Sequence, residues 1–511
     1  MSTPDEDIIK LIMGLKIKHI RLEKGVSQSE LSSKTGISVS YLNEIEKGKK
    51  HPKPSKIAAL ADALGVSYDD VVSLKLTNKL APVGELLRTN LLRELPLEHF
   101  GLDPTRLLDV FVTAPTRFSA FISTLIDLSR TYDLNLEEFY FMALRSYQEI
   151  HNNYFEEIEE LSDRFRQHFG LKEDQVPGED TLRNILEAHY GVTIHECDFS
   201  SFKHIKGLRT YFIEDPKPRL LLNERLNAHQ KSFSMAREVG YFFMNIRQRP
   251  FTSSWVQINS FEEVLNNFKA SYFAGALLLN RDRLVQDLRS FFGQASWDGP
   301  GFLQLMQRKT ASPEMFLQRL TALLPRFFNI NQLYFTRINY NPESASGYRL
   351  SKELNLSDPQ NHHAVRLQEH YCRRWTAITS LQELRRQTED GSSPDHIIQI
   401  QRATYVNTQQ EYLVISIARP LYPTPDELAS VSLGLPVNDN LRQKLQFLGD
   451  EQIPLREVNR TCERCGIPNC KERAADPVLL HRKERRQQMH QELERLKQMT
   501  FPEKAASHPQ N

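Results

Sequence analysis

The segment at residues 27–48 restricts the fold more than any other part of this sequence, because it encodes two short helices joined at a glycine. Ser27 is a helix N-cap, and Glu30, three residues later, completes a capping box. Gly36 stops that helix, and Ser38 caps a second helix that begins at once. Two short helices that meet at a tight turn have the geometry that places the second helix in the major groove of DNA.

Apolar residues at helical spacing supply a core for this segment. Met13, Ile17 and Ile20 lie at i, i+4 and i+7 of a preceding helix. The next two helices extend the apolar set with Leu31, Ile37, Leu42 and Ile45. Glycines stand where successive helices need a C-terminal stop, at Gly25, Gly36, Gly48 and Gly65. The sequence therefore predicts a five-helix domain over residues 8–75.

Residues 13–72 resemble the helix-turn-helix domain of the phage-repressor (XRE) type along every helix. The resemblance implies a homodimer that binds a pseudo-palindromic site in double-stranded operator DNA. It assigns phosphate contacts to Gln28 and Ser38. The residues that it places at base edges or beside them are Val39, Ser40, Glu44, Tyr41 and Asn43. It also implies an internal ion pair between Arg21 and Glu46, away from the DNA.

A cluster of lysines follows the second helix of the pair and would hold the DNA backbone electrostatically. Its members are Lys47, Lys49, Lys50, Lys53 and Lys56. The whole chain carries 65 Lys and Arg against 64 Asp and Glu, so affinity for DNA must come from a local patch of this kind. The alternative is a helical module that binds only proteins, since the same fold occurs without DNA binding.

A chain of 511 residues is too long for one hydrophobic core and predicts about three or four domains. We expect a multidomain fold that is mainly α with α+β parts. No apolar run approaches the roughly 18 residues that a membrane helix needs. The N-terminal segment MSTPDEDIIK is acidic and lacks the features of a secretory signal, so we expect a cytoplasmic protein without membrane contact.

Changes in residue pattern divide the rest of the chain. Helical periodicity predicts a connector that is a candidate for dimerisation. Strand-like runs and helices then alternate, with strands expected at 192–199, 208–223, 333–341, 396–406 and 411–422 and helices at 230–247 and 261–292. The predicted divisions are the connector at 76–170, an α+β domain at 171–300, a second α+β domain at 301–475 and a basic helical tail at 476–511.

The helices expected at 232–244 and 261–280 resemble those of the ImmA/IrrE-type metallopeptidases, whose first helix carries H-E-x-x-H. Here the motif reads Arg237-Glu238-Val239-Gly240-Tyr241. Zinc needs two histidines at i and i+4 with a glutamate between them as base, and Arg237 and Tyr241 supply neither ligand. We therefore expect a degenerate zincin-like scaffold without catalytic residues.

Two interpretations of that scaffold remain open. Either the helix pair is simply packed core, or the vacated cleft binds a small regulatory ligand. The stripe that would line a pocket in the second case is Tyr272, Phe273, Ala276 and Leu277.

Three cysteines near the C-terminal end have the C-x2-C-x4-C spacing of a metal or cluster site, Cys462, Cys465 and Cys470. Cys372 is the best candidate for a fourth ligand, ahead of Cys197, His481 and His490. A disulfide is disfavoured in a cytosolic protein. Zinc, an iron–sulfur cluster and three unconnected cysteines remain open, because spacing alone does not decide among them.

The combination of these parts resembles the short-chain fatty acyl-CoA regulators, which share the cysteine segment ending in E-R-A. That family's usual C-P-x-W is Cys372-Arg-Arg-Trp375 here. The resemblance implies a non-enzymatic transcriptional regulator of carbon metabolism, an acyl-CoA effector and, for some members, a 4Fe-4S cluster held by the four cysteines. The alternatives are a zinc-dependent peptidase that acts on a partner repressor and a helix-turn-helix protein-interaction scaffold.

Overall fold

The computed structural model describes residues 6–73, 136–172, 175–252, 258–310, 312–342, 347–356, 369–392, 394–406, 408 and 410–500. The chain divides into two compact units, one of residues 1–147 and 258–265 and one of residues 148–257 and 266–511. Residues 76–135 of the predicted connector at 76–170 lie outside the described residues. The prediction that the connector is a candidate for dimerisation falls mostly on that part. No helix of the described residues is long and apolar enough to cross a membrane.

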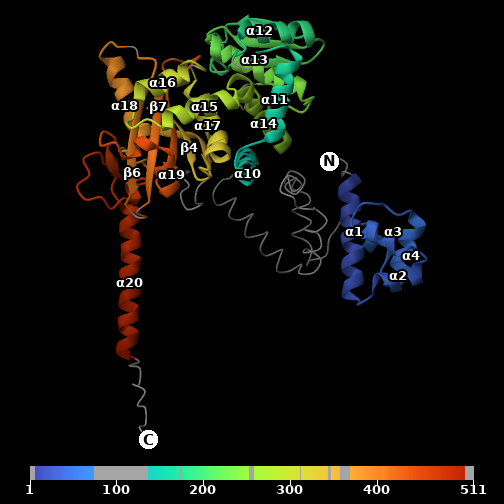
Figure 1. Ribbon diagram of the computed structural model, residues 1–511. Coiled ribbons are helices and arrows are strands. Elements are labelled where there is room, and N and C mark those ends of the chain that lie inside the picture. The colour runs from blue at the N-terminus through green and yellow to red at the C-terminus, as the bar shows by residue number, and fades with distance from the viewer. Residues whose placement is uncertain are drawn as a thin grey trace. The chain divides into compact units, whose positions relative to one another are not determined.

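The first unit contains the predicted five-helix domain (Figure 1). Its helices are α1 (Glu6–Glu23), α2 (Gln28–Thr35), α3 (Val39–Glu46), α4 (Pro54–Leu64) and α5 (Tyr68–Val72). The capping box of Ser27 and Glu30 is confirmed, and α2 ends at Gly36 with a φ of 68°, which favours glycine. The predicted apolar residues lie in one core: Met13, Ile17, Leu31, Ile37, Leu42 and Ile45 are buried, and Ile20 packs against them. The sequence pattern therefore predicts this domain correctly.

The second unit begins with an α+β region around a small three-stranded sheet. The strand order is β1-β3-β2, with β1 and β3 parallel and β2 antiparallel to β3. The strands are β1 (Thr193–Cys197), β2 (Thr210–Ile213) and β3 (Arg219–Asn223). The accompanying helices are α10 (Leu136–Ile150), α11 (Glu156–His168), α12 (Glu179–Asn184), α13 (Ala228–Phe243), α14 (Phe261–Leu278) and α15 (Arg281–Phe292), and the first parts of α10 and α14 lie in the first unit.

A six-stranded sheet follows in the order β5-β4-β8-β7-β6-β9, antiparallel except for the β6–β9 pair. Its strands are β4 (Tyr334–Tyr340), β5 (Tyr348–Asn355), β6 (Ile397–Tyr405), β7 (Glu411–Pro420), β8 (Leu428–Pro436) and β9 (Leu455–Val458). The remaining helices are α16 (Gly299–Gln307), α17 (Pro313–Phe328), α18 (Thr376–Glu389), α19 (Asp439–Lys444) and α20 (Val478–Thr500).

Helices cover both faces of the six-stranded sheet. On one face α18 packs over the strands, and its Thr376 shares a hydrogen bond of 2.7 Å with Ser416 of β7. On the other face α17 packs over β4 and β8, and its Glu314 pairs with Arg337 of β4 at 3.1 Å. Because side chains alternate along a strand, the two faces of this sheet present different residues to two different helices.

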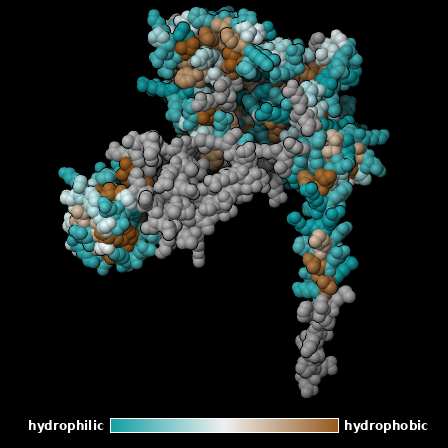
Figure 2. All heavy atoms as spheres, turned by 180° about the vertical axis from the view of Figure 1, so that it is seen from behind, coloured by the Kyte–Doolittle hydropathy of each residue, from teal (hydrophilic) through white to brown (hydrophobic). Residues whose placement is uncertain are grey.

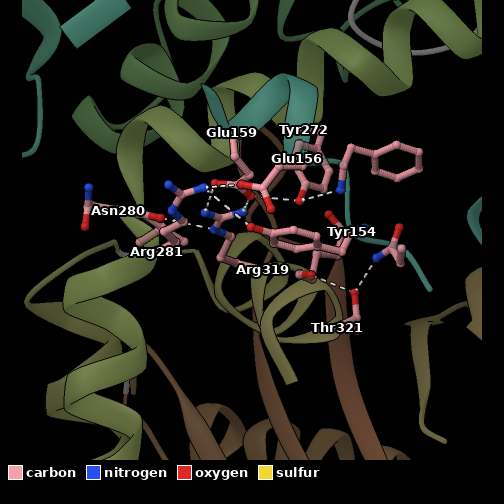
Figure 3. A network of polar contacts seen from close by, with 12 residues as sticks. Tyr154, Glu156, Glu159, Tyr272, Asn280, Arg281, Arg319 and Thr321 are labelled. Atoms are coloured by element: carbon pink, nitrogen blue, oxygen red, sulfur yellow. Dashed lines mark hydrogen bonds and ion pairs between the residues drawn. The ribbon is translucent and has the colours of Figure 1, made fainter. Parts of the chain in front are cut away.

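A buried polar network fastens the helices of the second unit (Figure 3). Glu159 of α11 and Arg319 of α17 form a double hydrogen-bonded ion pair, with 2.8 Å between Nη2 and Oε2. The Tyr272 hydroxyl of α14 donates to the same carboxylate at 2.8 Å. Although burial alone would raise the pKa of Glu159, the Arg319 guanidinium lowers it below its usual range. The carboxylate therefore stays ionised and holds α11, α14 and α17 together.

Two expectations about secondary structure need correction. The single helix expected at 261–292 is two helices, α14 and α15, because the Asn280 side chain accepts hydrogen bonds from the amides of Asp282 and Arg283 and starts a new helix. Strands β5, β8 and β9 were not predicted. The basic tail is helical as expected, in α20, and residues 501–511 lie outside the described chain.

Candidate nucleic-acid interface and altered metal site

The first turn of α3 forms an exposed surface on the helix-turn-helix domain. The Ser38 hydroxyl caps the helix by accepting a hydrogen bond from the Tyr41 amide at 3.3 Å. Val39 is 42% exposed, and Ser40 beside it is also exposed. Asn43 and Glu44, farther along α3, are half-buried. Of the residues assigned to base edges or beside them, Val39 and Ser40 therefore form the most accessible part of α3.

A buried ion pair joins α3 to α1 beneath this surface. Arg21 of α1 binds Glu46 of α3 through two hydrogen bonds of 2.6 and 2.9 Å, which confirms the predicted internal pair. The Gln28 amide nitrogen of α2 donates to the same carboxylate at 2.8 Å. Gln28 keeps a second N–H on that nitrogen, and a phosphate oxygen can accept it. The three helices are thus held in fixed relation at the residues expected to meet DNA.

Positive charge gathers directly after α3. Lys49, Lys50 and Lys53 are exposed, Lys47 is half-buried, and none of the four forms an ion pair with any residue of the described chain. Lys56 of α4 lies over the Tyr41 ring, with 4.4 Å from its Nζ to the ring centroid. Uncompensated lysine charge beside an accessible helix end is the electrostatic arrangement that binds phosphate groups.

The altered peptidase motif lies on α13 and is buried. Glu238 is 1% exposed, and its carboxylate forms an ion pair with Arg249. Arg237, in the place of the first histidine, lies 3.4 Å from the same carboxylate and donates to the Thr210 hydroxyl of β2 at 3.0 Å. The glutamate is therefore neutralised by arginine and is not exposed to solvent as a general base would be.

The Arg249 guanidinium lies between two aromatic rings at this site. Its Cζ is 3.9 Å from the Phe212 ring centroid and 4.2 Å from that of Tyr241, which stands in the place of the second histidine. The Tyr241 hydroxyl in turn hydrogen-bonds Asn267 at 3.0 Å. A cationic side chain thus contacts both the glutamate and the second ligand position of the motif. The residues present do not fit zinc, because no imidazole of the described residues faces the glutamate and a guanidinium already supplies the positive charge.

The stripe on α14 lies in packed core. Phe273, Ala276 and Leu277 are buried, and Phe273 packs against Phe165 with ring centroids 5.8 Å apart. Tyr272 points into the Glu159–Arg319 network (Figure 3). A cavity of about 190 Å³ in the same unit is lined by other residues and not by the stripe. Its lining includes Leu278, Leu279, Asn280, Arg166, Arg283 and Lys309.

The cysteine segments run side by side although 90 residues of sequence separate Cys372 from Cys462. The Cys372 amide donates to the Arg460 carbonyl at 3.1 Å, and the Cys462 amide donates to the His370 carbonyl at 2.9 Å. The structure therefore brings the Cys372 segment beside the C-x2-C pair.

The thiols themselves are in different environments. Cys372, Cys462 and Cys465 are buried, whereas Cys470 is partly exposed, with its sulfur 3.6 Å from the Glu472 carboxylate. Burial raises the pKa of the Cys372 thiol to about 11, so this thiol is protonated at neutral pH. Across the described ranges no three His, Cys, Asp or Glu side chains converge to hold a metal ion, and these cysteines are all free thiols. The side chains as placed do not form a four-thiolate ligand set.

Sequence reasoning missed the residues that complete these sites. Arg249 is eleven residues beyond Glu238 and lies outside α13, and no local pattern marks it as a partner. Arg319 lies 160 residues from Glu159. Pairs of this kind are set by the packing of distant segments and leave no periodic signal.

Two family models match the chain. One described as a helix-turn-helix matches residues 17–71, and one described as an IrrE N-terminal-like domain matches residues 187–321, which include the altered motif on α13. An uncharacterised HTH-type transcriptional regulator of Sinorhizobium fredii is 37% identical over 67 residues, 13% of this chain and 86% of that protein.

Two longer similarities extend beyond the first domain. The propionyl-CoA carboxylase regulator of Cereibacter sphaeroides is 23% identical over 288 residues, 53% of this chain and 57% of that protein. A solved structure described as a Mycobacterium tuberculosis transcriptional regulator has a TM-score of 0.46 at 17% identity and covers 66% of this chain and 93% of that chain. At that TM-score the likeness carries no argument about fold or function.

The altered motif predicts a protein that is stabilised by Glu238 but does not cleave peptides with it. Glu238→Gln leaves the Arg249 and Arg237 charges buried without a carboxylate and should lower the free energy of unfolding by about 3–5 kcal/mol, measured by urea denaturation. The exposed Glu187→Gln is the matched control and should change it by less than about 0.5 kcal/mol. Added zinc should produce no cleavage of casein. Zinc-dependent cleavage that Glu238→Gln abolishes would show that the site is a working peptidase.

Proposed function

Because this chain belongs to the helix-turn-helix family of transcriptional regulators, we propose that it controls transcription by binding operator DNA through α3 and the lysines that follow it. The observation that carries this proposal is the pairing of an accessible, N-capped α3 with lysines that have no acidic partner in the described chain. Such charge is unnecessary for folding, and a phosphate backbone is its natural partner.

The roles of individual residues follow from this geometry. Val39 and Ser40, at the exposed start of α3, would enter the major groove and contact base edges. Gln28 and Ser38 would hold phosphates on either side and fix the orientation of the domain. The Arg21–Glu46 pair would keep α1 and α3 in register while the surface binds.

The signal that controls this regulator is proposed to be a metabolite of short-chain acyl-CoA metabolism or a redox change. The similarity to a protein named as a propionyl-CoA carboxylase regulator, over 53% of this chain, supports the metabolic part. Differential binding of such an effector to two arrangements of the dimer would change its fit to the two half-sites.

Two other candidate functions have less support than DNA binding. A zinc-dependent peptidase acting on a partner repressor needs the ligands that Arg237 and Tyr241 replace, and it needs a free Glu238. A scaffold that binds only proteins has no use for the unpaired lysines after α3. Direct DNA binding separates this last alternative from our proposal.

Replacing Lys49 and Lys50 together by Ala should weaken binding to any duplex DNA, because both lysines are assigned to phosphates. The slope of log K against log salt should become shallower by roughly 2 for each bound subunit, or about 4 for a dimer, measured by fluorescence anisotropy on a duplex of arbitrary sequence. Lys203→Ala with Lys206→Ala, two exposed lysines of the second unit, is the matched control and should keep the wild-type slope. An unchanged slope in the Lys49 and Lys50 variant would contradict the phosphate assignment.

The homodimer that a two-fold operator requires is proposed to form in part through α20. Met489, Leu493 and Leu496 are 56%, 58% and 59% exposed and lie at i, i+4 and i+7, on one face of the helix. Figure 2 shows hydrophobic surface along this helix. A second copy of α20 is the partner that this coiled-coil spacing favours.

Leu493→Glu with Leu496→Glu should therefore shift the protein from dimer to monomer in sedimentation velocity, because the charges cannot be buried against a second helix. Gln487→Glu with Gln491→Glu adds the same charge on other faces of α20 and should leave the dimer intact. A dimer that survives the leucine substitutions would place the interface elsewhere.

The cysteine segments are proposed to hold iron or zinc, since hydrogen bonds fasten Cys372 beside Cys462 and Cys465. Protein purified without oxygen should contain one of these metals by elemental analysis. Cys465→Ser should lose it, whereas Cys197→Ser, which changes a cysteine far from the segment in sequence, should retain it. Folded wild-type protein free of metal would refute this proposal.

A further inference from the structure

We propose that a buried cluster of cationic side chains between α17 and the six-stranded sheet binds the anionic group of a small metabolite, a phosphate or a carboxylate. The cluster consists of Arg209, Arg337, Lys352 and Arg419 around a single carboxylate, that of Glu314. This site goes beyond the proposed DNA binding and does not depend on it.

Three of the cations lie on one face of the six-stranded sheet. Arg337 of β4 is directly opposite Lys352 of β5 and Val431 of β8. Val431 is opposite Ile417 of β7, and Arg419 lies two residues beyond Ile417, so it projects from the same face. The strand register therefore gathers cations from β4, β5 and β7 under α17.

Glu314 neutralises only part of this charge. Its carboxylate contacts Arg337 Nη1 at 3.1 Å and Lys352 Nζ at 2.5 Å. Burial would raise the pKa of Glu314, but Arg337, Lys352 and Arg209 hold it well below its usual range. Arg337, Lys352 and Arg419 are three positive groups beside this one carboxylate, so positive charge exceeds negative charge here.

Arg419 is the member of the cluster that the protein leaves unpaired. It is 7% exposed, and its guanidinium has no hydrogen bond or ion pair with any other described residue. Burial and the nearby Arg209 and Arg337 lower its pKa to about 10, so the group still carries its charge at neutral pH. An unpaired buried charge is costly, and a second anion beside Glu314 would compensate it.

The N-terminus of α17 adds to the same potential. This helix of 16 residues begins at Pro313, and Glu314 lies in its first turn. The positive end of the helix dipole therefore faces the cluster together with the arginines. Lys352 is 50% exposed at its side chain, so the cluster reaches solvent on that side.

The donor chemistry defines the class of ligand. Guanidinium groups offer paired N–H donors that match two oxygens of a phosphate or a carboxylate. This excess of positive charge favours a ligand with more than one negative charge. Inorganic pyrophosphate and succinate represent the two sources of such oxygens.

The effect of Glu314→Gln on anion affinity distinguishes an anion site from a cluster that only stabilises the fold. If Glu314 merely neutralises the cations, Glu314→Gln lowers stability and creates no affinity that the wild type lacks. If the cluster is an anion site, Glu314 competes with the ligand. Glu314→Gln should then bind the anion more tightly than the wild type.

The test is isothermal titration of the full chain with pyrophosphate and, separately, with succinate, at constant ionic strength and without DNA. Saturable binding of at least one probe is expected, weakened roughly tenfold or more in Arg419→Gln and strengthened in Glu314→Gln. Lys352→Gln, at a half-exposed side chain, should weaken binding without affecting folding.

The matched control is Arg386→Gln on α18, whose side chain is 61% exposed, and it should bind like the wild type. Failure of both probes to bind the wild type would overturn the proposal, and so would equal binding in Arg419→Gln or Lys352→Gln. Pyrophosphate binding alone would identify a phosphate-bearing ligand, and succinate binding alone a carboxylate. DNA binding is measured separately, so its loss or retention bears on the other proposal only.

Discussion

The ion pair between Arg319 and Glu159 joins residues that are 160 positions apart in the sequence, and the helical part of the second unit is built around it. The Tyr272 hydroxyl on the same carboxylate adds α14 to α11 and α17. Burying two charges costs several kcal/mol per ion unless their hydrogen bonds are satisfied, so such a pair requires its surroundings to be accurately packed. Arg21 with Glu46 does the same for α1 and α3 in the first unit. In both units, then, a paired guanidinium fixes the helices that carry or support the candidate sites.

The altered peptidase motif on α13 also contains a buried carboxylate that is paired with a guanidinium. Glu238 lies on the buried face of α13, and Arg249 supplies a positive charge to it from between Tyr241 and Phe212. The arginine therefore balances the buried carboxylate charge at this place in the fold.

Local features of the fold could be predicted from the sequence, because caps, glycine stops and apolar periodicity act over a few residues. The capping box at Ser27 and the stop at Gly36 are of this type, and the Arg21–Glu46 pair followed from a family resemblance. The break at Asn280 was missed because its neighbours on both sides favour helix. Arg249 and the cation cluster could not be predicted, since they depend on which strands and helices meet, and strand register is a property of the whole sheet.

The two faces of the six-stranded sheet carry the two sites for which ligands are proposed. Arg337, Lys352 and Arg419 lie on the face under α17, whereas Cys372 packs in the core cluster shared by α18 and the opposite face. A ligand that neutralises the cations would remove repulsion on one face, and thiol chemistry at Cys372 would act on the packing of the other. Because close-packed interiors transmit strain and do not deform continuously, either event would bias the same sheet. Binding of an anionic metabolite and a redox change at Cys372 would then be coupled through β4 and β7. Each of the two events would shift the equilibrium of the other.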